Sequence, residues 1–200
     1  MSDFKSSTSP LICLTGGIAT GKTSVANWFA ARNWAVVCTD EIVHRLYEPD
    51  QDLPKEMAHE FGPAVITPEG RVNRSELAKI VFKEKGALQR LGALVHPRVR
   101  AIWKKQAAEA VYCGKKTMIV IPLAYETQIE KEFQQAWVVA CSEQEQKNRL
   151  RQRGLSEAQM KQRLASQWPL QKKIDLADLV IWNDGAWALT ETQLGKILMF

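Results

Sequence analysis

A glycine-rich loop directly behind an apolar run is the feature that most constrains this chain. Residues Gly16–Thr23 read Gly-Gly-Ile-Ala-Thr-Gly-Lys-Thr and follow the apolar run Leu11–Leu14. This pattern predicts a buried strand, a tight turn and then a helix whose N-terminus faces an anion. Gly16 and Gly21 allow backbone conformations that a Cβ would hinder, so that successive N–H groups can converge on phosphate oxygens.

The side chains of the loop indicate a nucleoside triphosphate with a metal ion. Lys22 places a cation where the β- and γ-phosphates would lie, and the hydroxyl of Thr23 suits Mg²⁺. A plain strand-to-helix turn would not need the lysine. The loop therefore predicts what is bound, and the reaction has to be inferred from other residues.

Length and composition favour one globular domain of ordinary size with a smaller inserted lobe. The chain has 200 residues, 46% hydrophobic and 24% charged, and no apolar run approaches the roughly 20 residues that span a bilayer. Its first nine residues are polar, without the apolar core of a signal peptide. The four cysteines, Cys13, Cys38, Cys113 and Cys141, lack C-x-x-C spacing, so we expect no metal or redox role for them and a cytoplasmic location. Because Cys13 and Cys141 fall within expected strands and Cys38 at the end of one, we expect buried free thiols.

Short apolar, β-branched runs alternate with longer amphipathic stretches. This alternation predicts an α/β fold, a parallel five-stranded sheet flanked by helices. The expected strands are Leu11–Thr15, Ala35–Cys38, Thr117–Ile121, Trp137–Cys141 and Leu179–Trp182. The first helix should begin within the loop and bury Val25, Ala26, Phe29 and Ala30.

Nearly 80 residues separate the second and third expected strands, far more than one crossover helix needs. This stretch predicts a helical lobe over about 50–113, inserted into a core of about 10–48 and 115–200, and such a lobe would serve a second substrate. Four prolines interrupt it, Pro49, Pro54, Pro63 and Pro68, and three segments have helical character, Ser75–Phe82, Ala87–Leu94 and Arg98–Tyr112.

A second helical pair, Glu143–Arg153 and Ser156–Gln167, is expected to hinge at Gly154 and to form a lid over about 143–168. Between Lys147 and Lys173 there are eight Lys/Arg and one acidic residue, a field that attracts phosphate-rich molecules. Nucleic acid is the alternative partner for such a field, and a solvated helix face is the simplest alternative. Arg149 and Arg153 are spaced i, i+4 and would project from one helix face, where guanidinium groups suit phosphate oxygens.

Phosphoryl transfer also needs a group that orients the nucleophile. Asp40 and Glu41 follow the second expected strand, and Asp40 could accept a hydroxyl proton, help to hold the metal or cap the next helix. His96 with Pro97 is expected to open a helix, where the histidine has either a ligand-binding or a structural role. Glu126 follows the third strand, as a site carboxylate or as the first-turn acid of a helix.

The order of several local sequences resembles the dephospho-coenzyme A kinase family from about Leu11 to Ala188. The segments that carry the resemblance are Leu14-Thr15-Gly16-Gly17-Ile18, Thr39-Asp40-Glu41-Ile42-Val43-His44-Arg45, Gly70-Arg71-Val72-Asn73-Arg74-Ser75-Glu76-Leu77, His96-Pro97, Pro122-Leu123-Ala124-Tyr125-Glu126, Arg149–Arg153, Gln167, Lys173 and Val180-Ile181-Trp182-Asn183-Asp184-Gly185. The family has a P-loop nucleoside-triphosphate hydrolase-like fold with an inserted helical substrate lobe and a helical lid.

The resemblance implies that ATP, with Mg²⁺ beside Thr23, phosphorylates the ribose 3′-hydroxyl of dephospho-coenzyme A in the final step of coenzyme A synthesis. It implies a catalytic set of Lys22, Asp40, Glu41, Arg149 and Arg153. The implied ATP contacts are Gly17, Ala19, Thr20, Gly21, Lys22, Thr23, Ser24, Asn183 and Gly185. The implied acceptor contacts are Asp40, Arg74, His96, Pro97 and Glu126.

The acidic turn departs from the family pattern, which is commonly Asp-Ala-Asp followed by three residues and Arg. With the register fixed on Arg45, Thr39 and Glu41 take the acidic positions and Asp40 lies between them. We expect Asp40 to be the base, with Glu41 as the alternative.

The rival functions are a nucleoside monophosphate kinase and, less similar to this chain, a P-loop switch or a nucleic-acid-binding module. We expect no nucleic-acid or membrane partner and a monomer or weak homo-oligomer.

Overall fold

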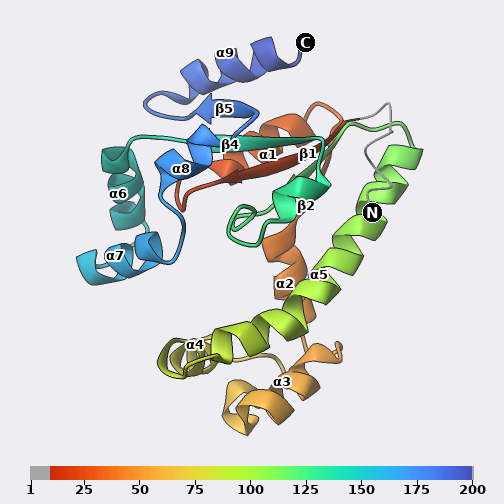
Figure 1. Ribbon diagram of the computed structural model, residues 1–200, viewed down its shortest axis with the longest axis vertical. Coiled ribbons are helices and arrows are strands. Elements are labelled where there is room, and N and C mark those ends of the chain that lie inside the picture. The colour runs from red at the N-terminus through yellow and green to blue at the C-terminus, as the bar shows by residue number, and fades with distance from the viewer. Residues whose placement is uncertain (1–9, 200) are drawn as a thin grey trace. The chain divides into compact units, whose positions relative to one another are not determined.

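The computed structural model describes residues 10–199, apart from the side chain of Phe82. The chain forms two compact units (Figure 1). Within the described residues, the first unit comprises 10–37 and 109–199, and the second comprises Cys38–Ala108. The first contains the sheet and the glycine-rich loop, and the second is helical.

The sheet has five strands in the order β2-β3-β1-β4-β5. Their bounds are Leu11–Gly16 for β1, Ala35–Cys38 for β2, Thr117–Val120 for β3, Gln135–Ala140 for β4 and Leu179–Trp182 for β5. β1 pairs in parallel with β3 and with β4, and β4 with β5. All five strands and the parallel sheet expected from the sequence are confirmed. Because β1 is central and buried throughout, the loop after it begins in the core.

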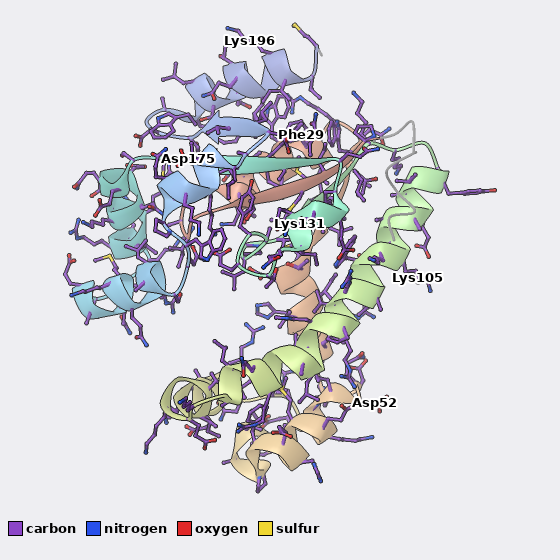
Figure 2. The ribbon with its side chains drawn as sticks, in the orientation of Figure 1. Phe29, Asp52, Lys105, Lys131, Asp175 and Lys196 are labelled. Atoms are coloured by element: carbon purple, nitrogen blue, oxygen red, sulfur yellow. The ribbon has the colours of Figure 1, made fainter. Side chains whose placement is uncertain are left out.

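Helix α1, Lys22–Ala30, starts immediately after Gly21 and covers β1. Its buried side chains include Val25, Ala26 and Phe29, as expected, whereas Ala30 is exposed. Phe29, labelled in Figure 2, lies 5.7 Å from the ring of Trp137 on β4. The tryptophans of this region therefore contribute to the core of the sheet.

Helices α6, Glu143–Gln152, and α7, Glu157–Ala165, form the helical pair expected from the sequence, here named the lid hairpin after its proposed role. Gly154 in the turn has a φ of 78°, which favours glycine. Ser156 caps α7 in a reciprocal capping box with Gln159, as the sequence predicted. The remaining helices of this unit are η2, Ile129–Glu132, α8, Leu170–Asp175, and α9, Trp187–Ile197.

The second unit differs most from expectation. It contains α2, Thr39–Leu46, α3, Leu53–Phe61, η1, Pro63–Val65, α4, Arg74–Lys83, and all but the end of α5, Ala87–Tyr112. The prolines do not exclude helix here, because Pro54 occupies the first turn of α3, where no N–H partner is lost. The expected break before His96 is wrong, since α5 is one helix of 26 residues with Pro97 inside it.

The four cysteines are free thiols; Cys13 and Cys141 are buried, Cys38 is half-buried and Cys113 is exposed. Within residues 10–199, no helix is long and apolar enough to cross a membrane.

Candidate active site

The loop after β1 has a backbone that only small residues at set positions permit. Gly16 and Gly21 have φ values of 143° and 99°, and Ala19 has a φ of 59°. A Cβ on Gly16 would lie 2.2 Å from the carbonyl oxygen of Val139, and one on Gly21 would lie 2.0 Å from Nδ2 of Asn183. Glycine is therefore required at both positions for two reasons, the backbone conformation and the close approach of a neighbouring atom.

Five successive carbonyl oxygens of the loop accept hydrogen bonds from side chains. Nζ of Lys22 donates to Gly16 O at 3.2 Å and to Gly17 O at 2.7 Å. The next three carbonyls belong to Ile18, Ala19 and Thr20, and their donors come from the lid helix α6 and from the residue that follows β5. Since C=O and the next N–H point in opposite directions across a peptide plane, the N–H groups that follow Ile18 and Thr20 point away from α6 and from Asn183.

Arg149 of α6 is the main support of the loop. Its Nη1 donates to Ala19 O at 3.3 Å and to Thr20 O at 3.2 Å, and its Nη2 donates to Asn183 O at 2.9 Å. Its Nε pairs with Glu145 at 2.8 Å. The predicted arginine therefore lies at the phosphate loop. Arg153 immediately follows α6 and is exposed.

Asn183 is buried directly after β5. Its Nδ2 donates to Thr20 O at 2.8 Å, and its Oδ1 accepts from the hydroxyl of Thr190 at 3.0 Å. This side chain is thus committed to the loop backbone. Gly185, two residues later, is exposed with a φ of 73°.

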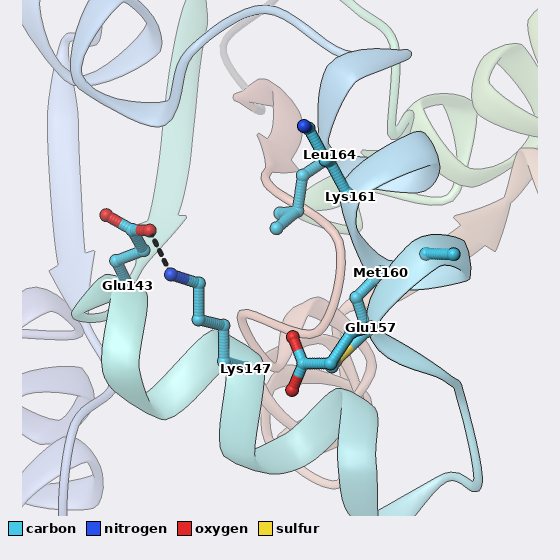
Figure 3. Close-up of a pocket in the computed structure, with 7 residues that line it drawn as sticks. Glu143, Lys147, Glu157, Met160, Lys161 and Leu164 are labelled. Carbon is cyan, nitrogen blue, oxygen red and sulfur yellow. Dashed lines mark ion pairs between the residues drawn. The ribbon is translucent and has the colours of Figure 1, made fainter.

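The lid hairpin also packs against the loop through apolar side chains. Ala19, Leu150 and Met160 form a buried cluster. Ile18, Leu155 and Leu164 pack against it. Between α6 and α7 the hairpin leaves a cavity of about 420 Å³, lined by charged side chains beside Met160 and Leu164 (Figure 3). Glu143 and Lys147 at its rim form an ion pair of 2.5 Å, which holds the pKa of Glu143 below its usual value.

A buried ion pair joins Lys173 to Glu126, which lies in the turn that follows β3. Lys173 of α8 is fully buried, and its Nζ lies 2.7 Å from Oε1 of Glu126 and 3.2 Å from Pro122 O. Oε1 also accepts from the N–H of Trp168 at 2.8 Å. Glu126 follows β3 in a turn, so the alternative of a first-turn acid on a helix is wrong.

Cys141 follows β4 near the two supporting cations. Burial raises the pKa of its thiol to about 11, although the charges of Arg149 and Lys22 act in the opposite direction. The thiol is therefore protonated at neutral pH and unsuited to nucleophilic chemistry.

The second unit contains the remaining expected residues. Asp40 and Glu41 are exposed in the first turn of α2, and the N-cap of that helix is Cys38, so the alternative of Asp40 as the cap is wrong. Arg74, at the start of α4, lies 2.8 Å from Nε2 of His44, and its guanidinium lies 5.3 Å from the centre of the Tyr47 ring.

His96 and Pro97 are exposed in the middle of α5. The ring of His96 lies over Gly92, one turn earlier, where a Cβ would come within 3.2 Å of it. Arg74, His96 and Pro97 thus lie in the helical unit, and sequence reasoning missed the contact of Arg74 with His44.

Comparisons with known proteins show the family of this chain. The model of the dephospho-CoA kinase family matches residues 10–188. The chain belongs to this family. It is 37% identical to the dephospho-CoA kinase of Symbiobacterium thermophilum, over 92% of this chain and 78% of that protein. It is 34% identical to that of Carboxydothermus hydrogenoformans, over 94% and 93%. Dephospho-CoA kinases are phosphotransferases, so the expectation of an enzyme is confirmed.

Solved structures confirm the fold of the dephospho-CoA kinase family for this chain. TT1252 from Thermus thermophilus superposes with a TM-score of 0.82 at 27% identity, covering 96% of this chain and 97% of that one. The dephospho-CoA kinase from Campylobacter jejuni superposes with a TM-score of 0.66 at 24% identity, covering 96% of each chain. A shikimate kinase from Acinetobacter baumannii, at 0.51 and 16% identity, shares the fold.

Proposed function

We propose that this member of the dephospho-CoA kinase family transfers the γ-phosphoryl group of ATP to the ribose 3′-hydroxyl of dephospho-CoA. The bond between the 3′-oxygen and phosphorus forms, the bond to the β-phosphate oxygen breaks, and ADP leaves with that electron pair. The observation that supports it best is the loop Gly16–Thr23, in which side chains bind the carbonyls of Ile18 and Thr20, so that the N–H groups that follow them point away from these donors. Such an array binds phosphate oxygens.

The residues fit ATP with Mg²⁺. Thr23 is exposed in the first turn of α1, beside Lys22, and a threonine hydroxyl there is a ligand that Mg²⁺ takes together with phosphate oxygens. Among the described residues, no group of three or more His, Cys, Asp or Glu could hold a metal by itself, so the ion would depend on the nucleotide. Bound there, Mg²⁺ would neutralise phosphate charge. The proposed ATP contacts are Gly17, Ala19, Thr20, Gly21, Lys22, Thr23, Ser24, Asn183 and Gly185.

The proposed roles divide between the two units. In the first unit, Lys22, Arg149 and Arg153 stabilise negative charge on the transferring phosphates. In the second, Asp40 takes the proton of the 3′-hydroxyl, and Glu41 is the alternative base. Both carboxylates are exposed at the start of α2, which directly follows the carboxyl end of β2, the edge at which α/β sheets bind ligands.

The proposed acceptor contacts are Asp40, Arg74, His96, Pro97 and Glu126. Arg74, His96 and Pro97 are exposed in the helical unit, where they are open to a ligand. Arg74 offers a guanidinium to the phosphates of the acceptor. Glu126 belongs to the sheet unit, and its Oε2 is buried without a hydrogen-bond partner among the described residues.

A coupled assay tests the proposal by offering dephospho-CoA beside AMP, UMP, CMP and GMP. Turnover of dephospho-CoA alone is expected, and turnover of only a monophosphate would instead favour the rival nucleoside monophosphate kinase. Single-turnover rates of Asp40→Asn and Glu41→Gln assign the base, because loss in Glu41→Gln alone would move it to Glu41. The cytoplasmic location and the state of monomer or weak homo-oligomer stay predictions, the latter to be tested by light scattering.

A further inference from the structure

The peptide unit of Ile18, in the middle of the phosphate loop, is held from both sides by glutamine side chains. Nε2 of Gln146 donates to Ile18 O at 2.7 Å, and Oε1 of Gln167 accepts from Ile18 N at 2.8 Å. The fixed polarity of the backbone assigns the two amides: Gln146 must offer its nitrogen, and Gln167 must offer its oxygen.

The two glutamines come from opposite ends of the lid hairpin. Gln146 lies in the first turns of α6 and is 5% exposed. Gln167 follows the end of α7, and the N–H of its neighbour Trp168 is bound by Glu126. Gln167 therefore extends from a fixed segment, and both ends of the hairpin are tied to the same residue of the loop.

Gly17 makes room for this contact. Unlike Gly16 and Gly21, it is not among the residues with positive φ, so its backbone conformation does not require glycine. A Cβ at this position would lie 2.6 Å from Nε2 of Gln146. An alanine would therefore displace the amide while the backbone of the loop stayed permitted.

We propose that Gln146 and Gln167 are positioning residues for nucleotide binding. By fixing both polar groups of Ile18, they set the peptide planes on either side of it and hence the direction of the N–H groups that meet the phosphates. They also make the geometry of the loop depend on the position of the lid. The inference rests on the proposed ATP site in this loop.

Two isosteric substitutions of equal charge test it. Gln167→Glu keeps an oxygen acceptor for Ile18 N–H, whereas Gln146→Glu places a carboxylate oxygen against Ile18 O. The test measures the Kd for ADP by calorimetry, and the kcat and the KM values for ATP and for dephospho-CoA. Gln146→Glu should raise the Kd and the KM for ATP about 10- to 100-fold, the range for one unsatisfied buried polar group. Gln167→Glu should recover most of the affinity that Gln167→Ala loses.

Two further signatures separate positioning from general damage. The affinity of Gln146→Glu should recover as the pH falls, because the protonated carboxyl becomes a donor. Gly17→Ala should reproduce Gln146→Ala, and the double variant should be no worse than either one. This pair also carries the test if Gln146→Glu does not fold. The control Gln162→Glu adds the same charge to an exposed position of α7 and should have no such effect.

Equal losses in Gln146→Glu and Gln167→Glu would overturn the proposal, because charge alone would then explain both. So would a change in melting temperature without a change in the KM for ATP. Lys22→Ala keeps this failure separate from that of the ATP site: if Lys22→Ala retains normal nucleotide affinity, the site itself is wrong. If Lys22→Ala loses nucleotide affinity but Gln146→Glu and Gln167→Glu lose equal amounts, the ATP site stands and the positioning role of the glutamines is rejected.

Discussion

Removing the buried cation Lys173 should destabilise the sheet unit more than any exposed charge change. Lys173→Met keeps the length and much of the apolar volume of the side chain. It leaves Glu126 without the ammonium group 2.7 Å away and removes the donor to Pro122 O. Glu126 is 15% exposed, so water reaches its carboxylate poorly.

The size of the effect follows from this burial. Breaking a buried pair by removing one partner costs about 3–5 kcal/mol, since the other charge stays desolvated. Glu126 retains slight exposure and the N–H of Trp168, so the lower end, about 3 kcal/mol, is expected. For a chain of this size, that corresponds to a fall of roughly 6–12 °C in Tm. Adding Glu126→Gln should restore most of the loss, because the amide neither needs a counter-ion nor loses the acceptor for Trp168 N–H.

Urea unfolding followed by circular dichroism measures the free energy of unfolding of the parent, of Lys173→Met, of Glu126→Gln and of the double variant. The matched control is Lys172→Met, the same substitution at the exposed neighbour, whose Nζ lies 3.4 Å from the centre of the Trp168 ring. It should cost about 0.5–1 kcal/mol, the value of an exposed cation–π contact. Additive losses in the double variant, or equal losses in Lys172→Met and Lys173→Met, would refute a coupled buried pair.

Three other outcomes are expected. Gly21→Ala should abolish nucleotide binding in calorimetry, because its Cβ would meet Asn183 in a strained backbone; affinity within twofold of the parent would contradict this. Iodoacetamide at pH 8 should label Cys113 in the folded protein and reach Cys13 and Cys141 only after unfolding, as peptide mass spectrometry can show. Because burial raises the pKa of Cys141 from 9.0 to about 11, its contribution to stability is complete below pH 9 and lost as the pH rises toward 11. Over that window the free energy of unfolding should fall less steeply in Cys141→Ala; equal slopes would exclude this residue as a cause.

The sheet was predictable because its strands are short apolar runs, and the loop was predictable because its spacing is fixed by phosphate chemistry. Arg149 lies beside the loop, as its basic segment indicated, but Arg153, expected on the same helix face, lies beyond the end of α6. The capping box at Ser156 was read correctly for the same kind of reason, since both partners lie within one turn. Local patterns thus account for the elements whose causes are local.

The supports of the loop could not be predicted in this way. Gln146 and Gln167 lie 128 and 149 residues from Ile18, and a glutamine on a polar helix carries no local signal of a buried contact. Gln167 was among the residues that carried the resemblance to the family, and Gln146 was not. Asn183 was expected near a ligand, which stays a prediction, and the hydrogen bonds of its side chain to Thr20 and Thr190 had no local signal either. Each of these contacts depends on chain segments that meet only in the folded sheet unit.

Pro97 is the position where a local rule failed, and it supports one more prediction. A proline inside a helix has no N–H for the carbonyl four residues earlier and crowds it, at a cost of about 3 kcal/mol relative to alanine. The carbonyl concerned is that of Ala93; Nη1 of Arg98 donates at 2.7 Å to the next carbonyl, Leu94 O, and does not replace the lost bond. Pro97→Ala should therefore raise the free energy of unfolding by about 1–3 kcal/mol.

An exposed residue that lowers stability is expected at a functional site, where it contacts a ligand. If His96 and Pro97 contact the acceptor, the stabilised Pro97→Ala variant should show a higher KM for dephospho-CoA with the KM for ATP unchanged. Ala101→Pro, at an exposed position one turn later in the same helix, is the converse control and should only destabilise. A stabilised variant with both KM values unchanged would remove Pro97 from the acceptor site, and an unstabilised one would show that α5 already compensates for its proline.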